Sequence, residues 1–520
     1  MRPQCSAKPP VLDLGRTFLQ SVERSPQATA IVDGPLRLTY AQWFERIVRV
    51  AGGLAALGLG RGDRLLVVMQ NRWEMATLHW ACQFLGVIVT PINWRAKADE
   101  IGYCAADAGA RALVFEALSA AAVLQVPRLT GVPGVGVGVA VGEAPVGTLR
   151  FEALLEATPL EPALHANAED ISLLLYTSGT TGRPKGVPRR HRAERAAALA
   201  HVAQNLYAPG ERALGVMPLY HTMGVRSLLA MALVDGAFVC MPRFDAGTAL
   251  QTIASERITH LYLVPTLYHD LIAHPAFGAT DVSSVRKLGF AGAPMHDALL
   301  QRLQAAFRPQ LFVNHYGSSE IFTFTVNQDA ARNPGSAGRA GISARVRVVK
   351  LAATRPDDLA APGEEGQIIA DLAGDEAFDG YWNRPDADAK ALRAGWYFTG
   401  DTGYFDAEGA LFVTGRMDDM IISGGENISP ADIESALSLH AAVDEVTVAG
   451  LADERWGQRV VAFVKRNAPV SADDLDAHCR RSALADFKRP REYVFVRAIP
   501  KSPVGKILRR KLVSGEYELE

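Results

Sequence analysis

One short run of the sequence has the composition of an anion-binding loop. Residues 176–186 read YTSGTTGRPKG, and they follow an apolar stretch, residues 171–175, that predicts a strand. Glycine and small hydroxyl residues let the backbone approach an anion closely, and N–H and hydroxyl groups can donate to phosphate oxygens. The run does not follow the Walker pattern G-x-x-x-x-G-K-[ST]. It therefore predicts a phosphate loop of another type.

Further runs follow in a fixed order and give that loop a context. They are MPLYH at 217–221, FAGAP at 290–294, YGSSE at 316–320, GWYFTGD at 395–401, GRMDD at 415–419, and PK to GK at 500–506. Together they resemble the adenylate-forming superfamily over residues 12–515. The runs DMIISGGENI at 419–428, LADERWGQ at 451–458 and ADFKRP at 485–490 are most similar to 4-chlorobenzoate–CoA ligases and related aryl-CoA ligases.

The resemblance implies activation of a carboxylic acid by ATP, followed by transfer of the acyl group to the thiol of coenzyme A. Because the first step joins two anions, positive charge must lie between them. By resemblance, Lys506 bridges the carboxylate and the α-phosphate, Glu320 holds Mg²⁺ together with Thr177, and His221 lines or gates the acid site. The residues expected to bind ATP are Thr177, Ser178, Gly179, Thr180, Thr181, Gly182, Lys185, Gly292, Ala293, Pro294, Tyr316, Gly317, Ser318, Ser319, Asp401 and Arg416.

A rotating C-terminal lid is implied by the same resemblance. Asp418 matches the hinge, and its rotation would withdraw Lys506 and bring a new edge to the acyl-adenylate. Arginine and aromatic side chains can pair with phosphate and stack on adenine. For Trp456 and Phe487, a packing role stays open. The expected coenzyme A contacts are Arg95, Ser423, Gly424, Gly425, Trp456, Phe487 and Arg489.

The acid pocket implied by the resemblance is unusually polar. Its expected members are Met217, His221, Thr222, Met223, Tyr262, Ala291, Gly292 and His315. Thr222, Tyr262 and His315 stand where the resemblance expects apolar groups. Since buried polar groups need partners, either a substrate heteroatom or a structural water would satisfy them. The sequence favours a small aromatic or heteroaromatic acid of the hydroxybenzoate, chlorobenzoate or 2-furoate type, and its bulky pocket residues argue against long-chain fatty acids.

The elements that must position these residues alternate between strands and helices. Apolar runs at 64–69, 171–176, 237–241, 261–264 and 287–291 predict strands, and 40–57 and 297–307 predict helices. This alternation predicts an α/β fold with largely buried strands. We expect a large N-terminal domain of sheets and helices at 1–417 and a small α+β lid at 418–520. In that lid, Ser429 is the expected N-cap of a helix that starts at Pro430, with Asp432 and Glu434 suited to its positive end.

Composition excludes several other classes of protein. The 520 residues carry a formal net charge of -2, so no global basic field attracts nucleic acid. The five cysteines are scattered without a C-x-x-C pair, which argues against a disulfide framework or zinc site and fits a reducing cytoplasm. Neither a membrane span nor an N-terminal signal core is visible. We expect a cytoplasmic monomer or homodimer that binds a small acid, ATP and coenzyme A.

Three alternatives keep part of this interpretation. A stand-alone adenylation enzyme would load a carrier protein instead of coenzyme A, although nothing in the chain resembles a carrier domain. A luciferase-type oxygenase would need a luciferin. A nucleotide-binding sensor on the same fold predicts loss of Lys506 or Glu320, and both residues are present.

Overall fold

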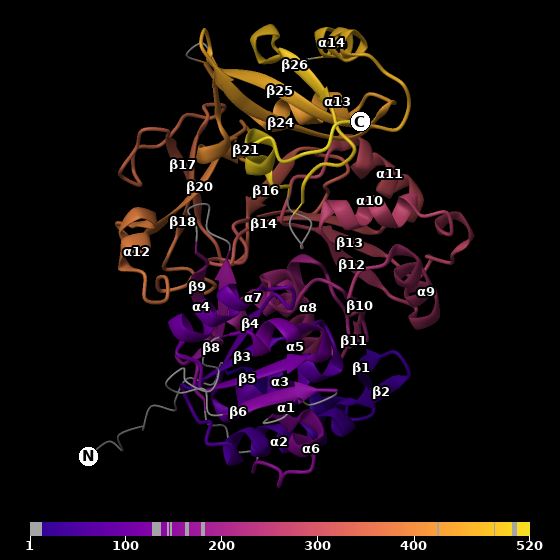
Figure 1. The fold of residues 1–520 in the computed structure, drawn as a ribbon, viewed down its shortest axis with the longest axis vertical. Coiled ribbons are helices and arrows are strands. Elements are labelled where there is room, and N and C mark those ends of the chain that lie inside the picture. Colours follow the sequence, from indigo (N-terminus) through magenta and orange to yellow (C-terminus); the bar gives the residue numbers. More distant parts are fainter. Residues whose placement is uncertain are drawn as a thin grey trace.

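The computed structural model describes residues 13–126, 137–142, 145, 148–161, 166–177, 183–423, 426–482, 484–501 and 507–520. In this part of the chain the strands form three sheets. Two of them build the large N-terminal domain, and the third belongs to a small C-terminal domain that lies above it in Figure 1. The fold is α/β with a small lid, as the sequence predicts.

The largest sheet runs through the middle of the molecule. Its strands β10, β12, β13 and β14 are parallel, and β14 pairs antiparallel with β15. Because the carboxyl ends of parallel strands meet at one edge, the segments that follow β12, β13 and β14 are brought together there. In spatial order the sheet comprises β17 (Val346–Lys350), β18 (Gly366–Asp371), β20 (Trp396–Phe405), β21 (Leu411–Arg416), β16 (Ser336–Ala340), β15 (Thr325–Asn327), β14 (Leu311–Tyr316), β13 (Lys287–Phe290), β12 (His260–Leu263), β10 (Arg212–Gly215), β11 (Ala237–Cys240), β1 (Thr29–Asp33) and β2 (Leu36–Thr39), with β19 (Leu392–Arg393) paired to β20.

The second sheet carries the phosphate-loop segment. Its last two strands, β8 and β9, are antiparallel and are connected by residues 178–184, with Thr177 opposite Lys185. Both β3 and β4 are buried along almost their whole length, which explains their near-continuous apolar sequences. In order, the strands are β7 (Leu149–Arg150), β6 (Val137–Val141), β5 (Ala112–Glu116), β3 (Arg64–Val68), β4 (Ile88–Ile92), β8 (Ile171–Thr177) and β9 (Lys185–Arg190).

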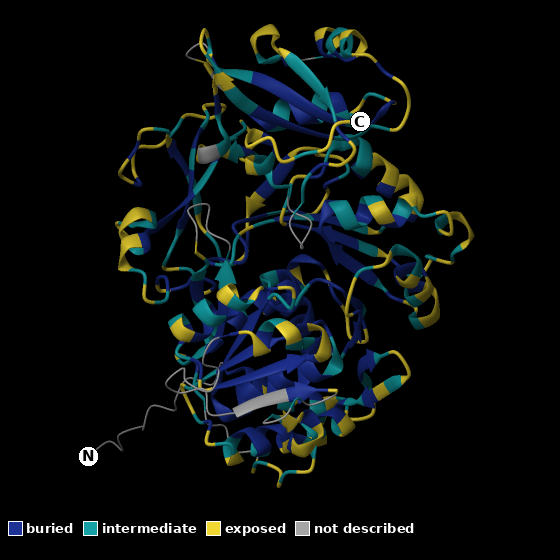
Figure 2. Cartoon of the chain, viewed as in Figure 1, coloured by how far each residue is buried: buried dark blue, intermediate teal, exposed yellow. Residues whose placement is uncertain are grey.

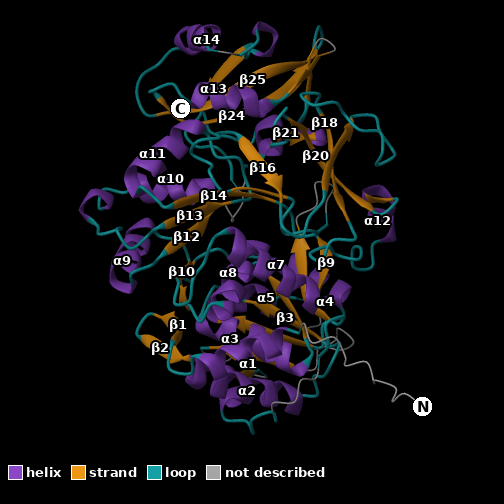
Figure 3. Cartoon of the chain, turned by 180° about the vertical axis from the view of Figure 1, so that it is seen from behind, coloured by secondary structure: helices purple, strands orange, loops and turns teal. Residues whose placement is uncertain are grey.

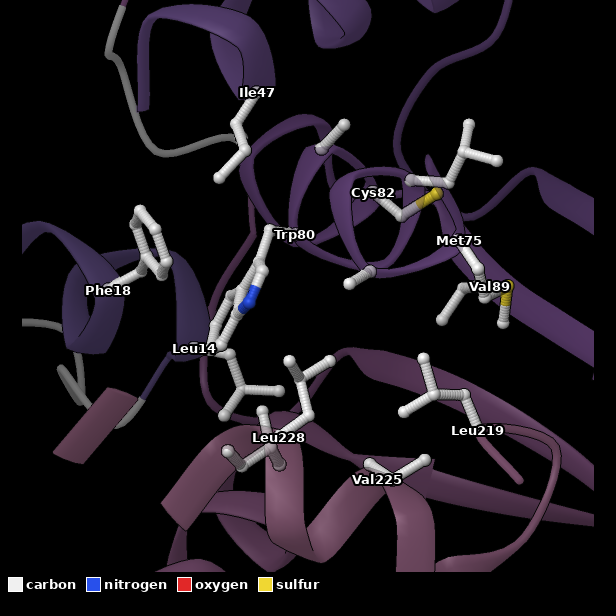
Figure 4. Packing of buried hydrophobic residues seen from close by; sticks show 14 of the residues in the cluster. Leu14, Phe18, Ile47, Met75, Trp80, Cys82, Val89, Leu219, Val225 and Leu228 are labelled. Atoms are coloured by element: carbon white, nitrogen blue, oxygen red, sulfur yellow. The ribbon is translucent and has the colours of Figure 1, made fainter. Parts of the chain in front are cut away.

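Helices fill the space between and around the sheets. Helix α3 is buried from Glu74 to Leu85, and its Trp80 contacts Phe18 of α1 with ring centroids 4.7 Å apart. Figure 4 shows this cluster, where Leu14, Trp80, Val225 and Leu228 join α1, α3 and α8 in one apolar core. The helices are α1 (Leu14–Arg24), α2 (Tyr40–Ala56), α3 (Trp73–Leu85), α4 (Ala98–Ala108), α5 (Ala117–Leu124), α6 (Phe151–Leu155), α7 (His191–Gln204), α8 (Thr222–Leu233), α9 (Ala246–Glu256), α10 (Pro265–Ala273), α11 (Asp297–Phe307), α12 (Pro385–Ala391), α13 (Pro430–Ser438), α14 (Ala472–Arg481) and α15 (Arg509–Val513).

The view from behind shows α9, α10 and α11 along the outer side of the large sheet (Figure 3). Burial follows the layers: the strands are mostly buried and the outer helix faces are exposed (Figure 2). No helix among the described residues is long and apolar enough to cross a membrane.

The lid has its own sheet and core. Its strands are β22 (Ile421–Ser423), β23 (Glu426–Ile428), β24 (Val443–Asp453), β25 (Gly457–Arg466) and β26 (Glu492–Phe495). Ile433, Leu437, Val448 and Leu475 pack in an apolar cluster between α13, α14 and the sheet.

Two sequence expectations for α13 need correction. Ser429 occupies the N-cap position, but its hydroxyl makes no cap hydrogen bond and donates instead to the carbonyl of Thr414. Glu434 is buried, where it accepts two hydrogen bonds from Arg509, at 2.7 and 2.9 Å. The tertiary partners of both side chains, which the local helix signal does not contain, decide their roles.

The predicted elements otherwise coincide closely with the structure. The helix expected at 297–307 is α11 with the same bounds, and that expected at 40–57 is α2. Each of the five predicted strands is present as β3, β8, β11, β12 or β13, within one residue at either end.

Candidate active site

The carboxyl ends of β12, β13 and β14 bring three sequence runs to one place. Ala291 and Gly292 follow β13, while His315 and Tyr316 end β14. Gly292 has a φ of +84°, and a Cβ there would lie 3.4 Å from Val264 and 3.8 Å from the sulfur of Met223. The turn at Gly292 therefore lies against the start of α8, and it continues into Ala293 and Pro294.

The run at 217–221 is held by a residue that the sequence analysis missed. Asn71, buried between β3 and α3, donates through Nδ2 to the carbonyls of Gly215 (2.9 Å) and Met217 (2.6 Å). Its Oδ1 accepts from the N–H of Leu219 at 2.9 Å. The run ends at His221, which occupies the N-cap position of α8 and whose N–H donates to the carbonyl of Pro218. Met217 and Met223 are buried on either side of this turn.

Tyr316, Asp401 and Arg416 form one contact group. The Tyr316 hydroxyl donates to Oδ2 of Asp401 at 2.6 Å, and Arg416 lies 3.3 Å from Oδ1 of the same carboxylate. Asp401 and Arg416 are register partners on β20 and β21. Burial, followed by the negative charge of Asp401, raises the pKa of Tyr316 well above its ordinary value, so its hydroxyl stays protonated as a donor. A carboxylate fixed in this way suits recognition of a ribose diol.

Glu320 lies in a second contact group, beside the phosphate-loop hairpin. The hydroxyl of Tyr381 donates to Oε1 of Glu320 at 2.7 Å, and the Lys185 ammonium lies 4.2 Å from the centre of the Tyr381 ring. Burial lowers the pKa of Lys185, and the nearby negative charge of Glu320 opposes this shift. The hydroxyl of Thr177 donates to the carbonyl of Lys185 at 3.4 Å.

The turn before Glu320 is tightly constrained. The hydroxyl of Ser318 accepts from the N–H of Glu320 at 3.2 Å. A Cβ on Gly317 would lie 2.1 Å from the carbonyl oxygen of Phe322, so only glycine fits there without movement. Ser319 lies half-buried in the same turn. These restraints set the direction in which the Glu320 carboxylate points.

Among the expected acid-pocket residues, Met217, Met223, Tyr262 and Ala291 are buried in one cluster and His315 is also buried, whereas His221 and Thr222 are half-buried. Tyr262 and His315 are buried, with ring centroids 5.3 Å apart. The Thr222 hydroxyl oxygen is itself buried and has no hydrogen-bond partner among the described residues. Burial raises the pKa of the neighbouring Tyr220 to about 12. The structure adds Arg226, whose Nη1 donates to the Tyr262 hydroxyl at 3.4 Å.

The expected coenzyme A contacts divide between the two domains. Arg95 belongs to the N-terminal domain and stacks on Trp94 at 3.8 Å. On the lid, Ser423 pairs with Gly457, the residue after Trp456. The guanidinium of Arg491 lies over the Trp456 ring, 3.9 Å from its centre. Phe487 is 48% exposed, as a stacking surface requires. Arg489 is ion-paired with Asp476 and Asp486 at 2.5 and 3.1 Å.

Several predicted site residues lie outside the described part of the chain. The expected hinge, Asp418, falls within the short helix η2 (Met417–Asp419). The residues outside are Ser178, Gly179, Thr180, Thr181, Gly182, Gly424, Gly425 and Lys506.

Sequence reasoning missed Tyr381, Asn71 and Arg226, each for a different reason. Tyr381 lies in the run Gly380-Tyr381-Trp382, whose aromatic content was a usable signal. Asn71 and Arg226 lie in otherwise ordinary segments, and their roles depend on contacts with residues 148 and 36 positions away.

The donors present are compatible with Mg²⁺ bound together with a nucleotide. Mg²⁺ prefers one or two carboxylates plus phosphate and water oxygens, and the single buried carboxylate of Glu320 beside Lys185 and Thr177 is such a donor set. Within the described residues, no group of three or more His, Cys, Asp or Glu side chains is arranged to hold a metal without a substrate.

Comparisons with known proteins identify the family to which the chain belongs. The family model for AMP-binding enzymes matches residues 18–382, and that for the AMP-binding enzyme C-terminal domain matches residues 432–506. The chain is 34% identical to a feruloyl-CoA synthase from Amycolatopsis over 95% of this chain and 97% of the relative. It is also 34% identical to a long-chain-fatty-acid–CoA ligase from Mycobacterium tuberculosis (96% and 98% covered) and to a 4-chlorobenzoate–CoA ligase from Arthrobacter (95% and 93%).

A solved structure extends the likeness to the whole fold. The anthranilate CoA ligase AuaEII in complex with anthranoyl-AMP superposes with a TM-score of 0.90 at 27% identity, covering 98% of both chains. With its two family matches and full-length relatives, the chain belongs to the AMP-binding enzymes, as an acid–CoA ligase of the AMP-forming acyl-CoA synthetase type.

Proposed function

We propose that the chain activates a small aromatic or heteroaromatic carboxylic acid as its acyl-AMP and passes the acyl group to coenzyme A. The observation that carries the proposal is the adjacency of two sites at the end of β14. Tyr316 donates to Asp401 in the contact group assigned to the nucleotide, and the preceding residue, His315, lies against Tyr262 in the expected acid pocket. Because β14 ends at Tyr316, an acid bound beside His315 and a nucleotide held at Asp401 would meet at the carboxyl end of this strand.

The walls of the pocket favour a ring over a long chain. Met217, Met223, Tyr262 and His315 are all buried, and Gly292 lies against Met223. The buried rings of Tyr262 and His315 would leave little room beside them for a long alkyl chain. Named relatives act on feruloyl, 4-chlorobenzoyl and long-chain fatty acyl groups, so ancestry alone does not choose between these classes.

The residues divide the work of the adenylation step. Asp401, oriented by Tyr316 and Arg416, would hold the ribose, while Lys185 and Thr177 border the loop for the β- and γ-phosphates. Glu320 would hold Mg²⁺ through an oxygen or a water, and the ion would supply positive charge to the phosphates. From the sequence, Lys506 is the residue assigned to bridge the carboxylate and the α-phosphate.

Transfer to coenzyme A would use the lid. We propose that the chain rotates at Asp418, so that residues 1–417 and 418–520 act as two bodies. Ser423 and the glycines after it would then approach the acyl-adenylate, with Trp456, Phe487, Arg489 and Arg95 available to the nucleotide part of coenzyme A. The four cysteines in the described residues are free and buried, which supports assignment to a reducing cytoplasm.

Pyrophosphate release against a panel of acids, with and without coenzyme A, tests the proposal. The panel holds benzoate, hydroxybenzoates, 4-chlorobenzoate, 2-furoate, short and long fatty acids, and several amino acids. We expect turnover that depends on coenzyme A with at least one small ring acid. Turnover confined to fatty acids would refute the ring-acid assignment. Pyrophosphate release indifferent to coenzyme A would move the acceptor to a carrier protein.

A further inference from the structure

A cluster of buried polar side chains surrounds Tyr262 and His315, two of the residues expected in the acid pocket. It joins two helices to two strands and comprises His201 and Asn205 at the end of α7, Arg226 on α8, Tyr262 on β12 and His315 on β14. All five are buried. The ring centroid of His201 lies 4.7 Å from that of Tyr262 and 5.1 Å from that of His315. We refer to these five residues as the polar floor.

A glycine on the intervening strand lets the two pocket rings meet. Strands β12 and β14 both pair with β13, so they are two strand spacings, or about 9.5 Å, apart. Tyr262 is opposite Gly289, which in turn is opposite Val313, two residues before His315 on the same face. A Cβ on Gly289 would lie 3.0 Å from the Tyr262 ring. Because no side chain stands there, the Tyr262 and His315 rings approach to 5.3 Å.

The hydrogen bonds of Asn205 determine where the protons of the polar floor lie. Its Nδ2 donates to the carbonyl of His201 at 2.8 Å, so this atom is the amide nitrogen and Oδ1 faces His315. Nε2 of His315, 3.1 Å from Oδ1, must therefore carry a proton. Burial lowers the pKa of His315 well below its ordinary value, and the charge of Arg226 adds to this. The imidazole is neutral, and its Nδ1 is a bare acceptor.

That acceptor has no hydrogen-bond partner in the described part of the chain. Nδ1 of His315 is buried and makes no hydrogen bond to any described residue. An unpaired buried polar atom costs about 1–3 kcal/mol, so a ligand that donates to it gains binding energy. The hydroxyl of Tyr262 is the complementary group: it accepts from Arg226 at 3.4 Å, which leaves its own proton to be donated.

We propose that the acid substrate carries a hydroxyl group at the end remote from its carboxylate, and that Tyr262 and His315 select it. This inference rests on the proposed function and narrows its substrate class. A hydroxyl can accept from Tyr262 and donate to Nδ1 of His315 at once. A methoxy or furan oxygen can only accept, a chlorine does neither well, and an aromatic amine donates but accepts poorly.

Entry to the polar floor requires side chains to move, because its unpaired atoms are closed to water in this conformation. Met223 is suited to that movement. It lies one helical turn before Arg226 and against Gly292, and a methionine side chain adapts its shape readily. The substrate ring would take the place of this side chain between the turn at Gly292 and the floor.

Steady-state kcat/KM values for 4-hydroxybenzoate, 3-hydroxybenzoate, 4-methoxybenzoate, 4-chlorobenzoate and benzoate, with ATP and coenzyme A, test the inference. For the wild type we expect a hydroxybenzoate to exceed its methoxy or chloro analogue by about 10- to 100-fold. Tyr262→Phe and His315→Phe should each lower that ratio at least about fivefold. Because a ratio of two substrates is independent of the active fraction, partial misfolding of a variant does not obscure the result.

Tyr268→Phe is the matched control. Tyr268 is a buried tyrosine on α10 whose hydroxyl donates to the backbone carbonyls of Leu261 and Gly289, and its loss should leave the substrate ratio unchanged. Turnover of ring acids without a hydroxyl preference, or a preference that survives both pocket variants, would overturn the inference and leave the proposed function standing. Turnover of fatty acids alone would overturn both.

Discussion

At the scale of single residues, two tyrosine hydroxyls orient the two carboxylates of the nucleotide site. Tyr316 donates to Asp401 at 2.6 Å and Tyr381 donates to Glu320 at 2.7 Å. In each case the carboxylate lies in a sequence motif, whereas its partner lies 85 or 61 residues away. A hydrogen bond to a charged group contributes about 1.5–3 kcal/mol, enough to fix the direction of each carboxylate.

Tyr316→Phe should weaken nucleotide binding. Asp401 would keep Arg416 but lose its shorter partner, so we expect the KM for ATP to rise about tenfold while the KM for the acid changes little. Initial rates at varied ATP give the value. Tyr404→Phe is the control, because Tyr404 lies on β20, the strand that holds Asp401, and its ring stacks on Phe412. An unchanged KM for ATP would contradict the role given to Tyr316.

Tyr381→Phe isolates the hydrogen bond to Glu320, because phenylalanine retains the ring that lies beside Lys185. We expect the Mg²⁺ concentration for half-maximal adenylation to rise and the maximal rate to fall by about tenfold. Pyrophosphate release at varied Mg²⁺ measures both quantities. If the Mg²⁺ dependence stayed as in the wild type, Glu320 would not be the residue that holds the ion.

At the scale of elements, the start of α8 is fitted to the turn before it. The N–H of Gly224 donates to the carbonyl of His221 at 3.1 Å. A Cβ on Gly224 would lie 2.2 Å from the carbonyl oxygen of Pro218 and 2.4 Å from that of Met217. The position of Met217 and His221 at the acid pocket thus depends on the absence of one side chain in the helix.

Gly224→Ala should therefore disturb both stability and acid binding. We expect the free energy of unfolding to fall by about 1–3 kcal/mol, the usual cost of overpacking, and the KM for the acid to rise. Denaturant unfolding and steady-state kinetics measure the two effects. Gly278→Ala is the control, since a Cβ there meets nothing within 4 Å. Equal behaviour of the two variants would show that the turn tolerates the extra atom.

At the scale of the whole molecule, the lid contacts the N-terminal domain through charged groups. Nε2 of His269 on α10 lies 3.0 Å from Oδ1 of Asp444 on the lid. Asp270 lies 3.4 Å from Nδ1 of the same ring, and Lys465 pairs with Asp444 at 2.6 Å. Glu445 is also near, itself paired with Lys465 and Lys501. The negative groups around His269 favour its protonated form.

This contact should depend on pH. The hydrogen bond to Asp270, and then the charge of Asp444, raise the pKa of His269 above its ordinary value of 6.5, although burial opposes the shift. A raised histidine pKa means that the contact is fully present below pH 6.5 and is lost as pH rises through the raised value. As pH rises, we expect the fraction of molecules that make the His269–Asp444 contact to fall by less than about fivefold, because the contact is a modest ion pair.

Energy transfer between dyes on Leu206→Cys and Leu439→Cys, both exposed positions on the two domains, would measure that change across about pH 5 to 8. His269→Gln should flatten the profile. A lid contact that strengthens with rising pH, or a profile that survives in the variant, would contradict the role of His269.

The division of labour between the two domains leads to a further prediction. Lys506→Ala should abolish formation of the acyl-AMP, because it removes the charge assigned to the α-phosphate. It should spare transfer of the acyl group when synthetic acyl-AMP and coenzyme A are supplied. Single-turnover assays of each half-reaction separate the two effects. If both half-reactions fell equally, the lid would not exchange one set of residues for another between the steps.

The sequence by itself determined the chemistry and, to within one residue, the bounds of the strands and helices that it predicted in the large domain. Helix α11 has the predicted bounds, and the motifs that contain Glu320, Asp401 and Lys506 identify an adenylate-forming ligase, because each motif is a short contiguous run. Side chains within a few residues of each other are positioned by local backbone geometry, which composition and spacing encode well.

The tertiary structure alone decided how these motifs are supported and what the acid pocket presents. Asn205 and His315, 110 residues apart, meet only because β14 and the end of α7 lie side by side. Gly289 is important only because it lies on β13, between the strands that hold the Tyr262 and His315 rings. Ser429 and Glu434 look like ordinary helix-start residues until Thr414 and Arg509 are placed beside them. Sheet order and helix packing choose such distant partners, and no local pattern in the sequence specifies them.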